Sequence, residues 1–278
     1  MVKIAGIVAK PQRQVGRYLR RAMRVLEEMG VKVLVEKKAA NLLKITPGFN
    51  IEEIAVSADL IVVLGGDGTF LSVASRAVTA GVPVAGFNLG TLGFLTEMTK
   101  ESLENCLRDI CLGRARYSER KMLEIEIDSR RFLALNDVVI SMASIARIIT
   151  LSLVLNGSRV AEIRADGLIV STPTGSTAYS LSAGGPIVSP AVNGLLITPI
   201  CPHSLTFRSL VVPDDSLVQI GLVSRNSETC VTIDGQTVIP LEEGQEIRVM
   251  VHPVPLRLVV SPDVDYYGLL SQKLNWGN

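Results

Sequence analysis

Hydrophobic positions along the chain follow two different patterns. Before about residue 113, short runs rich in Val, Ile and Leu alternate with segments in which apolar residues recur at helical spacing. The predicted strands are Ile4–Ala9, Val31–Glu36, Leu60–Leu64 and Val82–Phe87. The predicted helices are Gln14–Met29, Ile51–Ser57, Phe70–Thr79 and Ser102–Cys111. Strands that alternate with helices predict an open parallel sheet covered on both faces.

After Tyr117 the pattern becomes a series of short strands separated by turns, with Asn156-Gly157 as a strong hairpin signal. The predicted strands are Met122–Ile127, Arg131–Leu135, Asp137–Met142, Ile148–Leu155, Val160–Ala165, Leu168–Ser171, Leu195–Ile200, Val218–Leu222, Cys230–Ile233 and Ile247–Val251. We therefore expect an α/β plus all-β protein with its active site between the two domains. An N-terminal open parallel α/β domain should span 1–118 and a C-terminal β-sandwich-like domain 119–256, with the tail 257–278 packing back on the first.

Composition excludes several classes of partner. The 278 residues carry 28 Lys and Arg against 27 Asp and Glu, a net charge of +1, and only 4% are aromatic. A balanced charge and few stacking rings argue against a nucleic-acid or membrane-surface partner. No apolar run reaches the roughly 20 residues of a spanning helix, and residues 1–11 are too short for a signal peptide. We expect a cytoplasmic protein.

Cysteine and histidine are too few for several kinds of site. The four cysteines lack C-x-x-C spacing and are interpreted as small buried hydrophobic residues, and only His203 and His252 are present. This excludes a credible zinc site and disfavours a Ser-His-Asp hydrolase. A general base is therefore expected to be a carboxylate.

The run from Leu60 to Phe70 carries the clearest chemical signal. The buried strand Leu60–Leu64 leads into Gly65-Gly66-Asp67-Gly68-Thr69, after which helical spacing resumes at Phe70. Ligands of open α/β sheets bind at such strand ends, where backbone N–H groups and a helix N-terminus favour phosphate. Asp67 at this turn suggests proton abstraction or magnesium binding; the alternative is a tight turn with a solvated carboxylate.

Four further segments concentrate glycine or polar residues, and each has a structural alternative. Residues 86–95 are a glycine-rich strand end or a simple connector. Asn136-Asp137 could recognise an adenine edge or a ribose, and the structural alternative is that the pair forms a β-turn. Residues 164–186 are dense in hydroxyl groups and glycine and can wrap a polyhydroxylated ligand against Tyr179, unless they form an exposed loop. Asp234-Gly235 most often marks a hairpin turn.

Taken together, these segments resemble the NAD kinases. Residues 65–69 are similar to the first signature of that family, Asn136-Asp137 to its Asn-acidic pair, and 164–186 to its long Thr/Ser/Gly signature. Residues 202–208 and 234–235 are also family-like. The chain has no P-loop, and its Gly-Gly-Asp-Gly-Thr run is shared with phosphofructokinases and with lipid kinases of the diacylglycerol and sphingosine type. The long signature that begins at Asp166 is the specific feature.

The resemblance implies transfer of the terminal phosphoryl group of ATP, or of another nucleoside triphosphate or polyphosphate, to the 2′-hydroxyl of the adenosine ribose of NAD, giving NADP. Mg²⁺ or another divalent cation would accompany ATP, with no protein metal ligand assigned. By analogy Asp67 is the base or positioning group, Gly68 and Thr69 lie near the transferred phosphate, Asn136 and Asp137 hold adenine and ribose, and Asp166 holds the nicotinamide carboxamide. The implied nucleotide-binding set also contains Phe87, Arg147, Arg164, Thr174, Thr177, Ala178, Tyr179, Ser180, Ser182 and Gln236. A homodimer or homotetramer is implied as well.

Two points stay open at the level of sequence. Arg147 lies where the family has a variable polar contact, and it either binds a phosphate or caps a strand. Two other functional classes are consistent with the turn at Asp67: a lipid or sugar kinase, and a non-catalytic NADP-binding regulator. NAD-independent ATP consumption with such an acceptor would favour the first of these. Tight NADP binding without phosphorylation of NAD would favour the second.

Overall fold

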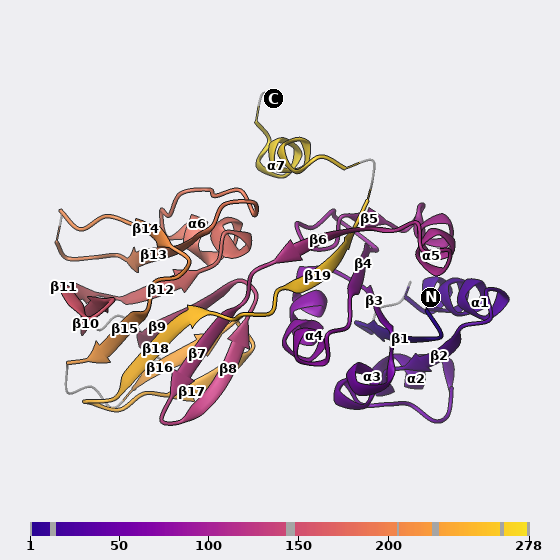
Figure 1. Cartoon of the computed structure of the whole chain (residues 1–278), viewed down its shortest axis with the longest axis horizontal. Coiled ribbons are helices and arrows are strands. Elements are labelled where there is room, and N and C mark those ends of the chain that lie inside the picture. Colours follow the sequence, from indigo (N-terminus) through magenta and orange to yellow (C-terminus); the bar gives the residue numbers. More distant parts are fainter. Residues whose placement is uncertain are drawn as a thin grey trace. The chain divides into compact units, whose positions relative to one another are not determined.

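The computed structural model describes residues 2–11, 15–142, 148–204, 206–223, 228–261 and 264–276 (Figure 1). The chain divides into two compact units. Unit 1 comprises Met1–Glu119 together with Leu256–Asn278, and unit 2 comprises Arg120–Pro255.

Unit 1 is built on a mainly parallel sheet. The strand order is β2-β1-β3-β4-β19-β6, with β5 paired to β4. The strands are β1 (Ile4–Ala9), β2 (Lys32–Val35), β3 (Leu60–Leu64), β4 (Val84–Asn88), β5 (Met98–Thr99), β6 (Arg116–Arg120) and β19 (Leu256–Val260). Because β3 and β4 are parallel, with Leu64 opposite Phe87, their carboxyl ends lie side by side. This register brings the segment after Leu64 next to the segment after Asn88.

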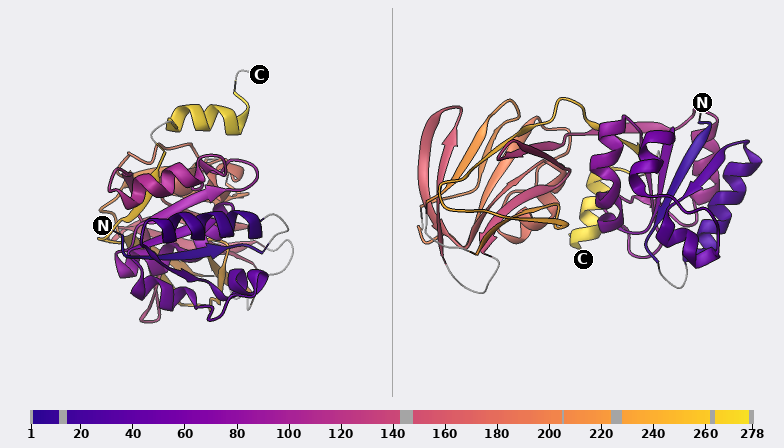
Figure 2. Two further views of the ribbon diagram at one scale, coloured as in Figure 1. Left: turned by 90° about the vertical axis from the view of Figure 1, so that its right-hand side faces the viewer. Right: turned by 90° about the horizontal axis from the view of Figure 1, so that it is seen from below.

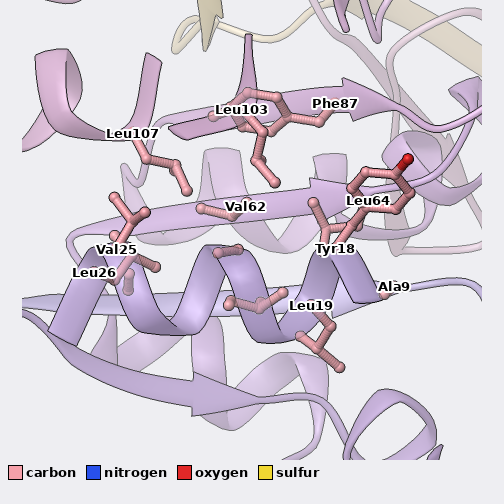
Figure 3. Close-up of a cluster of buried hydrophobic side chains, with 14 of the residues drawn as sticks. Ala9, Tyr18, Leu19, Val25, Leu26, Val62, Leu64, Phe87, Leu103 and Leu107 are labelled. Carbon is pink, nitrogen blue, oxygen red and sulfur yellow. The ribbon is translucent and has the colours of Figure 1, made fainter. Parts of the chain in front are cut away.

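Helices cover both faces of this sheet. The covering helices are α1 (Val15–Glu28), α2 (Lys37–Leu43), α3 (Ile51–Ser57), α4 (Asp67–Ala80) and α5 (Leu103–Cys111), and the chain ends in a further helix, α7 (Tyr266–Leu274). On one face α1 and α5 pack on the alternate strand residues Val62, Leu64 and Phe87 (Figure 3). On the other face the strands approach α3 and α4 so closely that a Cβ at Gly86 would lie 3.0 Å from Phe70.

Unit 2 is an antiparallel sandwich whose two sheets face each other (Figure 2). The first sheet has the order β11-β10-β15-β18-β7-β8. These strands are β7 (Leu123–Ile127), β8 (Arg130–Ala134), β10 (Ile149–Leu155), β11 (Ser158–Ala165), β15 (Val218–Leu222) and β18 (Glu246–Val251). Alternate residues of both sheets are buried between them, as the period of a strand requires.

The second sheet of the sandwich has the order β14-β13-β12-β9-β16-β17. These strands are β9 (Asp137–Met142), β12 (Gly167–Ser171), β13 (Gly194–Ile200), β14 (Leu210–Pro213), β16 (Thr229–Ile233) and β17 (Thr237–Pro240). The short helices η1 (Thr174–Thr177) and α6 (Tyr179–Ser182) follow β12.

The predicted fold class is confirmed: a parallel α/β unit and an antiparallel β-sandwich. Several local details differ from the expectations: strands β5, β6, β14, β17 and β19 and helix α7 were not predicted, and two further differences lie in unit 1. Helix α4 begins at Asp67 rather than Phe70, because the Thr69 N–H already donates to the Gly66 carbonyl at 2.9 Å. Helix α2 has no strong periodic pattern and forms because the Glu36 carboxylate caps it, accepting the N–H groups of Lys38 and Ala39. Among the described helices, none has the length and hydropathy needed to cross a membrane.

Candidate active site

In unit 1, the segment Gly65–Thr69 turns the chain from β3 into α4. Gly66 is the N-cap in an extended conformation, and Asp67 is the first helical residue. A Cβ built on Gly65 would lie 2.7 Å from the Thr69 hydroxyl oxygen, whereas one on Gly66 or Gly68 would meet nothing within 4 Å. The turn is therefore tight on its inner side and open on its outer side, at the amino end of a 14-residue helix. Such an end is suited to phosphate.

The Asp67 carboxylate is held by the segment that follows β4. Its Oδ2 accepts the Phe94 N–H at 2.9 Å. Its Oδ1 accepts the N–H groups of Leu95 and Thr96, each at 3.1 Å, and the Thr96 hydroxyl at 3.0 Å. A side chain at Gly93 would overlap with Oδ1, so this segment can close on the carboxylate only with glycine there. Asp67 is thus an oriented group rather than a freely solvated one, which removes the solvated-turn alternative.

In unit 2, a second carboxylate organises the start of β9. Asp234 lies in the β16–β17 turn with a positive φ of 49°. Its Oδ2 accepts the Leu135 N–H at 2.8 Å, and its Oδ1 accepts those of Asn136 at 2.8 Å and Asp137 at 3.1 Å. The Asp234 N–H donates in return to the Asp137 carbonyl at 2.9 Å. The turn is therefore attached to residues 135–137 by four hydrogen bonds, three of which involve Asn136 or Asp137.

The Asp137 side chain is 5% exposed and lies close to this second carboxylate. Burial and the nearby charge of Asp234 raise the pKa of Asp137 to about 7. Burial also raises the pKa of Asp234, against the opposing effect of its three N–H donors. Two like charges so close in a poorly solvated site favour keeping one proton on the pair.

Asp137 faces a pocket of about 370 Å³ on the outer face of the second sheet. The pocket combines apolar walls with carboxyl, amide and hydroxyl groups, a combination typical of small-molecule sites. Its lining residues are Asn136, Asp137, Val139, Ser141, Ala178, Tyr179, Thr232, Asp234 and Gly235. Carboxyl and amide groups that converge beside the exposed ring of Tyr179 can accept and donate hydrogen bonds to a ribose or a base edge.

The segment after β12 is fastened to the residues before β9. The Thr172 hydroxyl donates to the Leu135 carbonyl at 2.6 Å and accepts the Gly175 N–H at 3.0 Å. A Cβ at Gly175 would overlap with the Asn136 carbonyl, so only glycine allows the two segments to approach this closely. This contact brings the long signature together with the Asn-Asp pair.

The other predicted site residues have different surroundings. Arg164, Asp166, Ser182 and Gln236 are exposed outside the pocket lining, and Thr177 is half-buried. Thr174 is buried, and the buried Ser180 hydroxyl lies 2.9 Å from that of Thr198.

Two of the predicted residues remain, Phe87 and Arg147. Phe87 is fully buried in the core of unit 1 (Figure 3), so its ring is closed off from any ligand. Arg147 lies outside the described residues.

Sequence reasoning missed the groups that support the two carboxylates. Asn88 and Thr96 near Asp67 were not singled out as site residues, because short polar residues in a glycine-rich loop carry no distinctive spacing. Val139 and Ser141 line the pocket because every second residue of β9 from Asp137 onward lies on the same face of the sheet. The two-residue period of a strand could therefore have identified both of them from the sequence. Across the described ranges, no three His, Cys, Asp or Glu side chains are grouped closely enough to hold a metal ion.

Comparisons with known proteins agree with these features. The family model for the ATP-NAD kinase N-terminal domain matches residues 5–115, and that for the ATP-NAD kinase C-terminal domain matches residues 135–261. An NAD kinase of Geotalea daltonii is 44% identical over 255 residues, which cover 89% of each chain.

Two solved structures are similar over nearly the whole chain. Yeast NADH kinase complexed with NADH has a TM-score of 0.89 and 30% identity, covering 100% of this chain and 89% of that one. An NAD kinase from Archaeoglobus fulgidus in complex with ATP has a TM-score of 0.77 and 25% identity, covering 98% of each chain. Both family models match in order along the chain, and the Geotalea daltonii relative is 44% identical over 89% of each chain. The chain therefore belongs to the NAD kinase family.

Proposed function

We propose that this protein is an ATP-dependent NAD kinase that transfers the terminal phosphoryl group of ATP to the 2′-hydroxyl of the adenosine ribose of NAD. The observation that carries the proposal is the oriented carboxylate of Asp67 at the amino end of α4, in a chain that belongs to the NAD kinase family. Phosphoryl transfer depends mainly on positioning and charge stabilisation, so a single carboxylate among backbone amides suffices on the side of the acceptor.

Asp67 is the group that receives the reacting hydroxyl, and the open outer side of the turn at Gly68 takes the transferred phosphate, with Thr69 next to it in the chain. Asn136 and Asp137 hold the adenine and ribose of NAD in the pocket of unit 2. Ala178 and Tyr179 form the opposite part of that pocket lining.

The remaining predicted residues lie outside the pocket lining, and we assign them to the outer parts of NAD or to support of the segment. The exposed side chains of Arg164, Asp166, Ser182 and Gln236 and the half-buried Thr177 are available to a dinucleotide longer than the pocket. Thr174 and Ser180 support the segment from within, because both are buried. The fully buried ring of Phe87 takes no part.

Mg²⁺ is proposed as the companion of ATP. Magnesium commonly binds one or two carboxylates together with substrate phosphates and water, and neutralises charge on the transferred group. In this mode the phosphates of ATP and water supply most of the ligands, so we assign no side chain of this chain to the ion. Self-association as a dimer or tetramer is also proposed, and sedimentation velocity measures it directly. The four free cysteine thiols favour a reducing compartment such as the cytoplasm.

The experiment that tests the function is a discontinuous assay with the purified full chain, in which an NADP-specific dehydrogenase detects the product. ATP and polyphosphate are crossed with NAD and NADH, with Mg²⁺ present or chelated. We expect NADP from NAD and ATP only when Mg²⁺ is present. Tight NADP binding without product would indicate a regulator, and ATP consumption with a lipid or sugar acceptor but not with NAD would indicate the other kinase class.

Asp67→Asn is the decisive variant. It should lower kcat by about 100-fold or more, the usual loss when an acid–base or positioning carboxylate is removed. Asp59→Asn is the matched control, because Asp59 also accepts two backbone N–H groups in unit 1, those of Lys3 and Ile4. Equal turnover of the Asp67 and Asp59 variants would exclude the role given to Asp67.

A further inference from the structure

Asn88, the last residue of β4, is 6% exposed and has a fixed amide orientation. The Gly90 N–H donates to its Oδ1 at 2.7 Å, and a backbone N–H can only donate. The amide oxygen therefore faces Gly90, and the Nδ2 group faces the Thr96 hydroxyl oxygen at 3.1 Å. Since Nδ2 is only a donor, the Thr96 oxygen is the acceptor in this pair.

This arrangement determines where the Thr96 hydroxyl hydrogen lies. Thr96 is fully buried, and its hydroxyl has one hydrogen to donate. With Asn88 occupying an acceptor position, the hydrogen is directed to Asp67 Oδ1, 3.0 Å away. The chain of donors runs in one direction, from the Gly90 N–H through Asn88 and Thr96 to the carboxylate.

The consequence is an asymmetry between the two carboxylate oxygens. Among the described residues, Oδ1 accepts three hydrogen bonds, from the Leu95 N–H, the Thr96 N–H and the Thr96 hydroxyl, whereas Oδ2 accepts that of the Phe94 N–H alone. A carboxylate oxygen has two lone pairs, so Oδ1 is saturated and Oδ2 keeps one acceptor direction. A rotation that exchanged the two oxygens would break these bonds.

We propose that Asn88 and Thr96 are positioning residues for phosphoryl transfer, which lock Asp67 so that Oδ2 alone is presented to the ribose 2′-hydroxyl. This inference rests on the proposed NAD kinase activity. In the step, the hydroxyl oxygen forms a bond to the terminal phosphorus of ATP while the bond from that phosphorus to the bridging oxygen breaks. ADP leaves with the electron pair of that bond, and the hydroxyl proton passes to Oδ2.

The test is a double-mutant cycle on the full chain with Thr96→Val, Asn88→Ala and the combined variant. Thr96→Val removes a hydrogen bond to a charged group, worth a factor of about 10 to 100. We expect kcat to fall by about that factor while KM for NAD and ATP changes by less than about three-fold. Asn88→Ala should lower kcat by about 3- to 10-fold, and the combined variant should be no slower than Thr96→Val, because Asn88 acts through the Thr96 hydroxyl.

Rescue and control variants separate positioning from loss of packing. Thr96→Ser keeps the hydroxyl and should retain kcat within about three-fold of the wild type. Thr229→Val is the matched control: Thr229 is 2% exposed in unit 2, and its hydroxyl donates to the Met142 sulfur at 3.6 Å, far from Asp67 in the chain. It should leave kcat unchanged. Should Thr96→Val fail to fold, Thr96→Ala against Thr96→Ser provides the same comparison.

Three results would overturn the proposal: an unchanged kcat in Thr96→Val, effects of Asn88 and Thr96 that multiply in the combined variant, or equal losses in Thr96→Ser and Thr96→Ala. A wild type that makes no NADP would instead contradict the proposed function. Because wild-type activity is measured first, the two failures are distinct.

Discussion

The protonation of Asp137 makes the stability of unit 2 depend on pH. Burial and the charge of Asp234 raise the pKa of Asp137 to about 7, well above the 3.8 of an ordinary aspartate side chain. Between about pH 4 and pH 7, Asp137 therefore keeps its proton in the folded state and has lost it in the unfolded chain. Stability from this group is fully present below about pH 4 and is lost as the pH rises through 7.

The size of the effect follows from linkage. Between the two pKa values the free energy of unfolding falls by at most about 1.4 kcal/mol per pH unit. The slope decreases as the pH approaches 7, so the total between pH 5 and pH 7 is roughly 2 kcal/mol. Asp137→Asn has nearly the same shape and cannot ionise, so it lacks this slope. As the pH rises from 5 to 7, the wild type should therefore lose roughly 2 kcal/mol of stability relative to Asp137→Asn.

The assay is urea unfolding at several pH values, followed by circular dichroism. Limited proteolysis identifies the transition that belongs to residues 120–255, because a chain of two units need not unfold in one step. Asp234 also has a raised pKa, and because the two carboxyl groups interact, the wild-type slope belongs to the pair and is removed when Asp137→Asn leaves Asp234 without a charged neighbour. Equal slopes for the wild type and Asp137→Asn between pH 5 and pH 7 would refute the reasoning.

Two further substitutions test the supports of the carboxylates. Gly93→Ala places a Cβ where Asp67 Oδ1 lies and should displace the carboxylate. We expect kcat to fall by about 10- to 100-fold with little change in the KM for NAD. An unchanged kcat would contradict the close contact between Gly93 and Asp67. Asp234→Asn replaces an acceptor oxygen by an NH₂ group facing backbone N–H donors. NAD affinity, measured by calorimetry, should fall by about 10-fold, since a lost hydrogen bond to a charged group costs about 1.5–3 kcal/mol, and unaltered affinity would argue against this support.

The two candidate half-sites share one structural principle. In each, a carboxylate that follows or precedes a strand end accepts several backbone N–H groups of a neighbouring segment: residues 94–96 at Asp67 and residues 135–137 at Asp234. Each bonded segment is held by a half-buried carboxylate in addition to the packing of its buried leucine, Leu95 in one and Leu135 in the other. This explains why glycine is required where the segments approach most closely, at Gly93 and Gly175.

The sequence by itself determined the elements and the fold class. Apolar runs such as Leu60–Leu64 are buried on both faces of a parallel sheet, whereas alternating strands such as Leu123–Ile127 bury one face only. The two patterns therefore predict a covered parallel sheet and a sandwich, respectively. The residues of the signature motifs also pointed to the chemistry, because glycines and a carboxylate at a strand end have few other uses.

Only the tertiary structure decided how the site groups are held. The partners of Asp67 are 27 to 29 residues away along the chain, and those of Asp234 are 97 to 99 residues away. No local pattern records contacts of that separation. The parallel register of β3 and β4 places Asn88 and Thr96 beside Asp67, and the pairing of β9 with β16 places Asp234 beside Asp137. The same register places the ring of Phe87 in the core, where its apolar character is satisfied by packing rather than by a ligand.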